Sequence, residues 1–461
     1  MQWHNGMRAV VLGLGTAGLA TVHFLLHRHI RVAVSDVRRR EQIDAEILAC
    51  LRNMAVELET GEHSAAFCAK ADVLVPSPGV PLDLPVLTAA REQGVPVVGE
   101  LAMAAGLFQA PVIAVTGSNG KTTVTSLIGE LLLAAGKTPF IGGNIGTPLL
   151  EYFNDPDRYD VVVLELSSFQ LDLAGAFRPD IGVLLNISPD HLDRHGSLEA
   201  YTAAKMRIFS GQQSGDIAIF GDDDPVVASI QQNTGVSGYR FGAGPHCNAR
   251  IDEGMVHLNV QHQQSVRKEL YDLRETKLHS SVNRLNAAAA ILVAALHGSS
   301  QQAINAGLAA FIPPPHRMTE VTMIAGVRFI NDSKATNVGA LQAALAGCSA
   351  PVILIAGGRD KGGDYMLLRD VVEQRVKHLV LLGEAASKMA AALDMIVPTQ
   401  LAASMEDAVR ASMAVAEAGD IVLLAPGCAS FDMFSGYAER GRVFCECVHR
   451  LQQDQTVKEE I

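Results

Sequence analysis

The chain has 461 residues, of which 48% are hydrophobic and 19% are charged. This composition excludes a disordered polymer, and the length exceeds what one hydrophobic core supports, so about two to four domains are expected. The net charge of −12 argues against a broad nucleic-acid-binding surface, because neutralising phosphates requires a basic face.

The first predicted element is a strand over residues 8–12, which enters the glycine turn Gly13-Leu-Gly15-Thr-Ala-Gly18 and then a helix. A second strand over residues 31–35 ends at Asp36. Glycines at this spacing followed by an acid resemble a dinucleotide fingerprint, although any ligand with a diphosphate could use the same turn.

A third strand is predicted over residues 71–75, and it ends in the rigid turn Pro76-Ser-Pro-Gly79. Ligands of open α/β sheets bind at the carboxyl ends of strands, so this turn is either part of a ligand site or purely structural. Residues 95–98 close this first unit near residue 99.

The β-branched run over residues 112–116 predicts a buried parallel strand, which breaks into Gly117-Ser-Asn-Gly120 before Lys121-Thr122-Thr123 opens a helix. The glycines let successive N–H groups face one anion, Lys121 adds a full positive charge, and the Thr122 hydroxyl suits Mg²⁺. The spacing G-x-x-G-K-T is two residues shorter than the usual phosphate loop. The alternative is an ordinary glycine-rich turn, but the flanking strand and amphipathic helix favour a nucleotide-phosphate site.

Further polar groups follow the next predicted strands of this unit. A glycine-rich loop over residues 141–146 carries Asn144, and the strand over 161–165 ends in Glu165. A carboxylate beside a phosphate-loop strand is where Mg²⁺ needs a hard oxygen ligand. The strand over 181–186 leads to Asp190 and His191, which mark either a site or a solvated loop.

A helix is predicted from about Leu198, and it carries Lys205 after small apolar residues. This lysine is either functional or a side chain that extends its ammonium group to solvent. Asn283 and Asn286, at i and i+3 near the start of an alanine-rich helix, point the same way.

The prolines at 313–315 form a stiff link to a further α/β unit, in which strands over 327–330, 352–356 and 421–424 end in loops rich in glycine, lysine and hydroxyl groups. The predicted fold is therefore α/β with three domains. We place them at residues 1–99, 100–313 and 314–461.

The seven cysteines are scattered, without paired C-x-x-C spacing, which is typical of a reduced cytoplasmic protein rather than a disulfide framework or zinc site. Neither a signal segment nor an apolar run of about 18 residues is present. We expect a cytoplasmic protein without a membrane span that acts as a monomer.

Several motifs in this order resemble the Mur ligases, the cytoplasmic ATP-dependent amide-forming enzymes of peptidoglycan synthesis. They are Thr116–Thr122, Gly143–Gly146, Glu165–Gln170, Asp190-His191, Lys205, Asn283-x-x-Asn286 and His316-Arg317. The resemblance implies a Rossmann-like N-terminal domain, a central P-loop ATPase-like domain and a Rossmann-like C-terminal domain. Within the family, residues 164–171, 331–337 and 428–432 are most similar to those of members that join D-glutamate to UDP-N-acetylmuramoyl-L-alanine through an acyl phosphate.

The resemblance also implies roles for individual residues. The catalytic residues would be Lys121, Glu165, His191 and Lys205. One Mg²⁺ would be held by Thr122 and Glu165, and a second by Glu165, His191 and a carbamylated Lys205. ATP would be bound by Gly117, Ser118, Asn119, Gly120, Lys121, Thr122, Thr123, Asn283, Asn286, Arg317, Asp332 and Lys334.

The UDP end of the substrate would be bound by Gly15, Thr16, Asp36, Arg38, Ser77 and Gly79, and its muramoyl-peptide part by Asn144. The D-glutamate pocket would be formed by Thr336, Lys361, Ser430, Phe431 and Tyr437.

Four other interpretations stay open at this point. A nicotinamide-dependent dehydrogenase explains the N-terminal fingerprint but leaves Lys121 and Glu165 without a role. A P-loop motor or switch explains the phosphate loop but not the two other glycine-loop domains. A catalytically silent binding protein leaves the metal and phosphate groups unused, and a sister Mur ligase would add a different amino acid.

Overall fold

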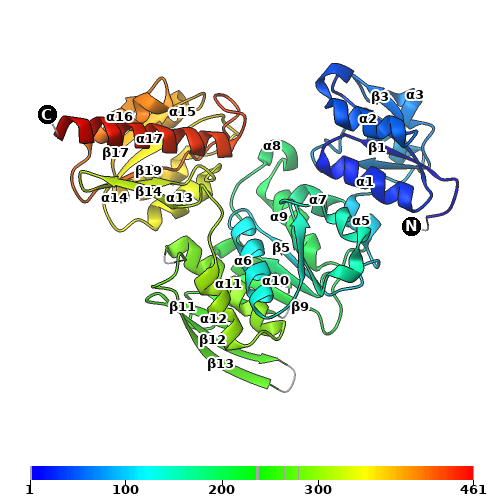
Figure 1. The fold of residues 1–461 in the computed structure, drawn as a ribbon, viewed down its shortest axis with the longest axis horizontal. Helices are drawn as coiled ribbons and strands as arrows, with labels where there is room; N and C mark the ends of the chain where they lie inside the picture. The colour runs from blue at the N-terminus through cyan, green and yellow to red at the C-terminus, as the bar shows by residue number, and fades with distance from the viewer. Residues whose placement is uncertain (1–2, 235–237, 263–264, 279, 460–461) are drawn as a thin grey trace.

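The computed structural model describes residues 3–234, 238–262, 265–278 and 280–459. The chain folds into three α/β domains in sequence order, each built on its own sheet (Figure 1). In this view the N-terminal domain (blue) and the C-terminal domain (yellow to red) lie apart, and the central domain lies below and between them. The three-domain α/β fold expected from the sequence is confirmed.

The N-terminal domain has a four-stranded parallel sheet in the order β3-β2-β1-β4. The predicted strands at 8–12 and 31–35 are present, the second extended by Asp36. The strands are β1 (Arg8–Leu12), β2 (Arg31–Asp36), β3 (Glu57–Thr60) and β4 (Val73–Pro76), and the helices are α1 (Thr16–His27), η1 (Arg40–Gln42), α2 (Ala45–Asn53), α3 (Ala65–Cys68) and α4 (Pro85–Glu92).

The central domain has a nine-stranded sheet in the order β13-β12-β11-β10-β9-β8-β5-β7-β6. Its strands are β5 (Val112–Thr116), β6 (Pro139–Gly143), β7 (Val161–Glu165), β8 (Ile181–Leu184), β9 (Ile217–Gly221), β10 (Tyr239–Gly242), β11 (Ala249–Asp252), β12 (Met255–His262) and β13 (Ser265–Asp272). The seven strands β5 to β11 all run parallel to one another, and β12 and β13 add an antiparallel edge next to β11.

Strand β5 lies between β7 and β8, and all five of its residues are buried because helices cover both faces of the sheet. Val112 and Ala114 face one core, and Ile113 and Val115 face the other. The second core is shared with α6 (Lys121–Ala134), α11 (Ser281–Leu296) and α12 (Gln301–Ala310). The remaining helices are α5 (Glu100–Ala104), η2 (Leu149–Asn154), η3 (Pro156–Arg158), α7 (Ser168–Asp172), α8 (Leu192–His195), α9 (Leu198–Met206), η4 (Arg207–Phe209) and α10 (Pro225–Thr234).

The C-terminal domain has a six-stranded sheet in the order β14-β15-β19-β16-β17-β18, parallel except for the β14–β15 hairpin. Its strands are β14 (Thr319–Ile324), β15 (Val327–Asn331), β16 (Val352–Gly357), β17 (Val376–Leu382), β18 (Thr399–Leu401) and β19 (Ile421–Leu424). Its helices are α13 (Val338–Ala346), η5 (Tyr365–Leu368), α14 (Arg369–Arg375), α15 (Ala386–Ala392), α16 (Met405–Val415) and α17 (Tyr437–Glu459).

All seven cysteines are free, which agrees with the reduced usage expected from their spacing. Within the described ranges, none of the helices combines the length and the apolar character that crossing a membrane requires.

An aromatic seam joins the N-terminal domain to the central domain. The Phe24 ring of α1 lies 5.2 Å from the Phe153 ring of η2 in an edge-on arrangement, and Phe153 also contacts Phe108 and Tyr152. The Arg28 guanidinium lies 3.7 Å over the Phe24 ring. One continuous hydrophobic cluster therefore spans both domains, whereas the C-terminal domain has separate cores.

Phe153→Ala removes the ring at the centre of this seam. A fully buried Phe→Ala change costs about 3–5 kcal/mol, and because Phe153 is half-buried we expect a loss of about 1–3 kcal/mol in unfolding free energy. Urea denaturation followed by circular dichroism measures this loss. Leu133→Ala, at a side chain that is 57% exposed, is the matched control and should change little. Equal stabilities of the two variants would contradict a seam that holds the domains together.

Candidate active site between the central and C-terminal domains

A cavity of about 500 Å³ lies where the central and C-terminal domains meet. It brings together predicted residues that are more than 300 positions apart in the chain, from Ser118 to Tyr437. The predicted residues that line it are Ser118, Asn119, Gly120, Lys121, Thr122, Thr123, Asn144, Glu165, His191, Asn283, Asn286, Arg317, Asp332, Lys334, Thr336, Lys361, Ser430, Phe431 and Tyr437.

The phosphate loop forms one wall of the cavity. Gly117 and Gly120 have φ angles of 154° and 84°, which side-chain-bearing residues rarely adopt, so the glycines are required by the backbone. The Lys121 Nζ donates to the carbonyl oxygens of Gly117 and Ser118 at 2.9 and 2.8 Å. Burial lowers the pKa of Lys121, although the nearby Glu165 opposes this shift. The loop thus holds its lysine folded back on its own carbonyls.

Glu165, at the end of β7, has one carboxylate oxygen bonded and one without a partner. Its Oε1 accepts a hydrogen bond from Asn144 Nδ2 at 2.7 Å. Its Oε2 is fully buried and has no hydrogen-bond partner among the described residues. A buried carboxylate oxygen without a donor is costly unless a cation binds it, and the Thr122 hydroxyl lines the same cavity. These two oxygen donors fit the predicted Mg²⁺ site.

Lys205 is buried, with 1% of its surface exposed, so the alternative of a side chain extending to solvent is wrong. Its Nζ donates to the Gly117 carbonyl at 2.7 Å and lies 4.7 Å from the centre of the Tyr201 ring. Burial lowers the pKa of Lys205 well below its usual value, and the Lys121 charge lowers it further. The amine therefore lies behind the phosphate loop and loses its proton more readily than a surface lysine does.

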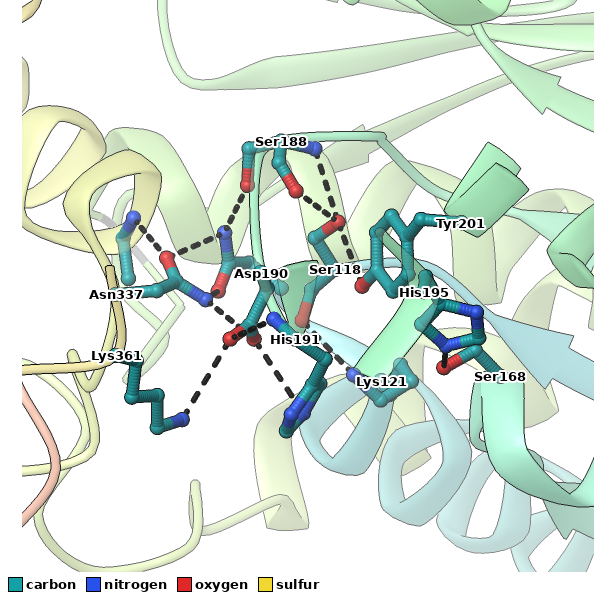
Figure 2. A network of polar contacts seen from close by, with 12 residues as sticks. Ser118, Lys121, Ser168, Ser188, Asp190, His191, His195, Tyr201, Asn337 and Lys361 are labelled. Carbon is teal, nitrogen blue, oxygen red and sulfur yellow. Dashed lines mark hydrogen bonds and ion pairs between the residues drawn. The ribbon is translucent and has the colours of Figure 1, made fainter. Parts of the chain in front are cut away.

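His191 has a left-handed backbone conformation with φ 54°, and its ring packs edge-on against Phe169 at 4.9 Å. The preceding Asp190 faces the C-terminal domain, where its Oδ2 accepts from Asn337 Nδ2 at 3.0 Å and its Oδ1 lies 3.5 Å from Lys361 Nζ (Figure 2). Burial opposes ionisation of Asp190, but the charge of Lys361 holds its pKa below the usual value. The loop after β8 thus connects both domains at the cavity.

The predicted ATP residues beyond the phosphate loop come from both domains. Asn283 and Asn286 are buried on the first turns of α11, as their spacing predicts. From the C-terminal domain, burial raises the pKa of Asp332 to about 7, although the nearby Arg317 opposes this. Burial and the charge of Arg317 lower the pKa of Lys334 to about 8.

The predicted D-glutamate residues line the C-terminal side of the cavity together with Lys334, whose Nζ lies 4.0 Å over the Tyr437 ring. Ser430 is buried, whereas 65% of Phe431 is exposed. A cation, a hydroxyl and an exposed aromatic ring lie along one wall, which suits a small anionic ligand with an apolar stem.

The six residues predicted for the UDP end lie outside this cavity, at the carboxyl ends of β1, β2 and β4. Both Asp36 oxygens are already bonded: Oδ2 accepts from the Leu14 N–H at 2.7 Å, and the Arg38 side chain donates to both oxygens at 2.9 Å. Ser77 Oγ donates to the Gly13 carbonyl at 2.8 Å. Asp36 therefore shapes the glycine turn, and the 41% exposed Arg38 side chain faces solvent beside it.

Asp190 and Asn337 line the cavity, and the sequence-based prediction assigned neither of them a role. Asn337 precedes α13 and accepts from the Ala340 N–H at 2.8 Å, which is ordinary helix capping. The sequence signal was an asparagine before an apolar helical run, and it predicts a cap without predicting that the same amide reaches another domain.

Comparison with known proteins matches three family descriptions along the chain. They are the Mur ligase MurD-like N-terminal domain over residues 7–99, the Mur ligase middle domain over 115–294, and the Mur ligase glutamate ligase domain over 316–428. Because the matches cover all three domains, neither a nicotinamide-dependent dehydrogenase nor a P-loop switch accounts for the chain.

Curated relatives match over almost their whole length. The UDP-N-acetylmuramoylalanine–D-glutamate ligase of Desulfotalea psychrophila is 46% identical over 442 residues, covering 96% of both chains. The protein of the same name from Syntrophotalea carbinolica is 41% identical over 98% of this chain and 99% of its own. Among solved structures, a MurF ligase from Thermotoga maritima in complex with ADP has a TM-score of 0.58 at 19% identity and covers 98% of this chain and 96% of its own. That structure is similar in fold.

The raised pKa of Asp332 predicts a pH dependence of stability. Its carboxyl has an ordinary value of 3.8 and about 7 in the folded protein, so between these values the folded state binds more protons than the unfolded chain. The free energy of unfolding should therefore fall as pH rises from about 4 to about 7, by up to about 1.4 kcal/mol per pH unit.

Urea denaturation of the unliganded protein at about pH 5 and about pH 7 measures this fall. The difference should shrink in Asp332→Asn, which cannot titrate, and persist in the control Asp83→Asn at an exposed carboxyl. An unchanged difference in Asp332→Asn would show that its carboxyl is ionised throughout this range.

Proposed function

The chain belongs to the Mur ligase family, and on that premise we propose that it is an ATP-dependent ligase that joins D-glutamate to UDP-N-acetylmuramoyl-L-alanine. The observation that carries the proposal is that one cavity is lined by the phosphate loop, by Lys361 and by Glu165, whose Oε2 has no partner in the described part of the chain. The names of the curated relatives support the choice of D-glutamate over another amino acid. ATP as the nucleotide agrees with the ADP complex of the MurF ligase that is similar in fold.

The first step activates a carboxylate. An oxygen of the L-alanine carboxylate attacks the γ-phosphorus of ATP, ADP leaves, and an acyl phosphate forms. Two anions must approach for this, so positive charge has to lie between them. Lys121 supplies it when its ammonium exchanges the Gly117 and Ser118 carbonyls for phosphate oxygens, and the N–H groups of the loop hold the same phosphates.

Mg²⁺ fits this site because Glu165 offers a buried oxygen that has no hydrogen-bond partner among the described residues, and Thr122 lines the same cavity. When bound, it would screen the repulsion between the polyphosphate and the substrate carboxylate. Asn144, which donates to the other Glu165 oxygen at 2.7 Å, fixes the carboxylate so that Oε2 is presented to the cation. His191 and a carbamylated Lys205 are the residues that we propose for a second Mg²⁺.

The surroundings of Lys205 support the proposed carbamylation. A buried amine that releases its proton readily can attack CO₂, forming an N–C bond and giving up one proton to solvent. The product carries a negative charge in place of a positive one. That change removes a repulsive neighbour of Lys121 and supplies oxygen ligands behind the phosphate loop.

The second step forms the amide bond. The amine nitrogen of D-glutamate attacks the acyl carbon, phosphate leaves, and a proton is released from the attacking nitrogen. Lys361, with the hydroxyls of Thr336 and Ser430, suits the carboxylates of D-glutamate, and Phe431 and Tyr437 suit its apolar stem. We propose that the UDP end binds at Gly15, Thr16, Asp36, Arg38, Ser77 and Gly79, on the same rigid unit as the phosphate loop.

The proposal is tested by phosphate release from ATP with UDP-N-acetylmuramoyl-L-alanine and a panel of D- and L-amino acids. D-glutamate should give the fastest turnover, and none should occur without an acceptor. Faster turnover with another amino acid would identify a sister ligase, and turnover without an acceptor would identify an ATPase.

Lys361→Ala tests the acceptor pocket. Loss of a charge-assisted hydrogen bond costs about 1.5–3 kcal/mol, so the KM for D-glutamate should rise about ten- to a hundredfold while the KM for ATP changes little. Lys388→Ala is the matched control, because Lys388 pairs with Asp360 at 2.6 Å in the same domain and does not line the cavity. Equal effects of Lys361→Ala on both substrates would contradict the assignment.

Lys205→Ala and Lys205→Arg test the carbamate. Lys205→Ala should abolish amide formation and keep most of the ATP affinity, because Lys121 and the loop N–H groups remain. A small carboxylic acid at high concentration should partly restore activity to Lys205→Ala but not to Lys205→Arg, whose guanidinium keeps the positive charge. Lys268→Ala, at an exposed lysine, is the control. Normal turnover of Lys205→Arg would show that the lysine is structural.

A further inference from the structure

Asn337 makes side-chain hydrogen bonds across the boundary between the C-terminal and central domains. It precedes α13, and its carboxamide lies against the phosphate loop and against Asp190 (Figure 2). Asn337 and Asn119 pair through their amides, with Nδ2···Oδ1 distances of 3.2 and 3.4 Å. Asn337 Nδ2 also donates to Asp190 Oδ2 at 3.0 Å. We name this set of contacts the Asn337 clasp.

The bonding capacity of the Asn337 carboxamide is fully used. Its Oδ1 accepts from the Ala340 N–H at 2.8 Å and from Asn119, and its Nδ2 donates to Asn119 and Asp190. Because the helix cap requires the oxygen as its acceptor, the orientation of the amide is fixed and its NH₂ group is the donor that faces Asn119 and Asp190. Aspartate at this position would keep the cap, lose both donated bonds and place a second carboxylate beside Asp190.

Helix α13 approaches the central domain closely at both ends. A Cβ at Gly339 would lie 2.6 Å from the Cβ and Oγ of Ser188, and one at Gly347 would lie 2.4 Å from Ser281 Oγ. Gly347 has a right-handed backbone and Gly339 lies within the helix without a left-handed φ, so neither glycine is required by its own backbone conformation. Both permit close contact between two domains instead.

The clasp joins groups that belong to two different parts of the proposed active site, the activation site and the acceptor pocket. Asn119 belongs to the phosphate loop, where the carboxylate is activated, and its backbone N–H donates to Asn186 Oδ1 at 2.8 Å. Asp190 lies 3.5 Å from Lys361, which belongs to the acceptor pocket. One carboxamide therefore fixes the distance between the activation site and the acceptor site.

We propose that Asn337 is a positioning residue for amide formation: its clasp seats α13 on the phosphate loop and so aligns the acceptor amine with the acyl phosphate. This rests on the proposed function. Binding of the nucleotide phosphates does not need the clasp, since the phosphate loop and Glu165 belong to the central domain. Arg317, Asp332 and Lys334 line the cavity from the C-terminal domain, so they add nucleotide contacts only when the two domains meet. Transfer needs it, because the acceptor is held by the other domain.

Asn337→Asp tests the clasp without removing the helix cap. We expect kcat to fall about 10- to 100-fold, the loss expected for two hydrogen bonds of which one is to a charged group. The dissociation constant of a non-hydrolysable ATP analogue should change less than kcat does, because the phosphate loop and Glu165 stay intact. The thermal midpoint should stay close to that of the wild type, because aspartate keeps the helix cap. Asn337→Ala also loses the cap, and Ser404→Ala, which uncaps α16 in the same domain, is its control. Ser404→Ala should lower stability without lowering kcat.

Gly339→Ala tests the same docking by a steric route. Alanine suits a helix interior better than glycine, so the C-terminal domain should not be destabilised, but the new methyl group collides with Ser188 only when α13 is seated. We expect kcat to fall at least about tenfold, as for loss of the clasp. Gly339→Ala with Ser188→Gly removes both colliding atoms and should restore most of the activity.

Small-angle scattering with the ATP analogue and the UDP-substrate separates this proposal from the proposed function. The wild type and the double variant should be more compact than Asn337→Asp and Gly339→Ala, whatever amino acid the enzyme uses. If the wild type does not turn over D-glutamate, the proposed function is wrong. The scattering comparison then tests by itself whether the clasp seats α13 on the phosphate loop. Wild-type compaction in both single variants, or wild-type kcat in either of them, would overturn the role of Asn337.

Discussion

The burial of several cations in one place is the constraint on which the cavity depends. Burial is the largest cause that lowers the pKa of four cations: Lys121, Lys205, Arg317 and Lys334. Positive neighbours lower the pKa of Lys121, Lys205 and Lys334 further, whereas Glu165 and Asp332 oppose the shift of Arg317. Lys121 and Lys205 both donate to the Gly117 carbonyl, which offsets only part of the cost of desolvation. An anion bound in the cavity would offset the repulsion between Lys121 and Lys334, which both line it.

The two domain junctions differ in the kind of interaction that forms them. The N-terminal domain meets the central domain through aromatic rings, and separating them exposes apolar surface, which water does not compensate. The C-terminal domain meets the cavity through amides, a carboxylate and Lys361, and water can replace those contacts at a small net cost. The first two domains therefore share one apolar core, whereas the contacts of the C-terminal domain at the cavity are polar.

The sequence predicted what is encoded locally. The strand over 112–116, its glycine loop and the carboxylate at the end of β7 follow from β-branched runs, glycine spacing and strand ends, all of which act within a few residues. The burial of Lys205 could not be predicted, because Tyr201 and the Gly117 carbonyl reach it only through the fold. The pattern ending at Asp36 predicted a ligand-binding acid, which stays a prediction, and it did not indicate that this carboxylate also bonds the glycine turn and the neighbouring Arg38. A motif thus locates a site more reliably than it assigns each side chain its partner.

The Asp190 carboxylate contacts two side chains of the C-terminal domain, and the two contacts differ in strength. Its carboxylate holds Asn337 at 3.0 Å and Lys361 at 3.5 Å, so one of its two cross-domain contacts is tight and the other is loose. Because 29% of the Lys361 side chain is exposed, a substrate carboxylate can approach it from the solvent side and take over the ammonium at little cost. Asp190 would then keep its amide contact and the domain contact with it. The amide contact would thus keep the two domains in contact while the acceptor of the proposed reaction replaces the ion pair.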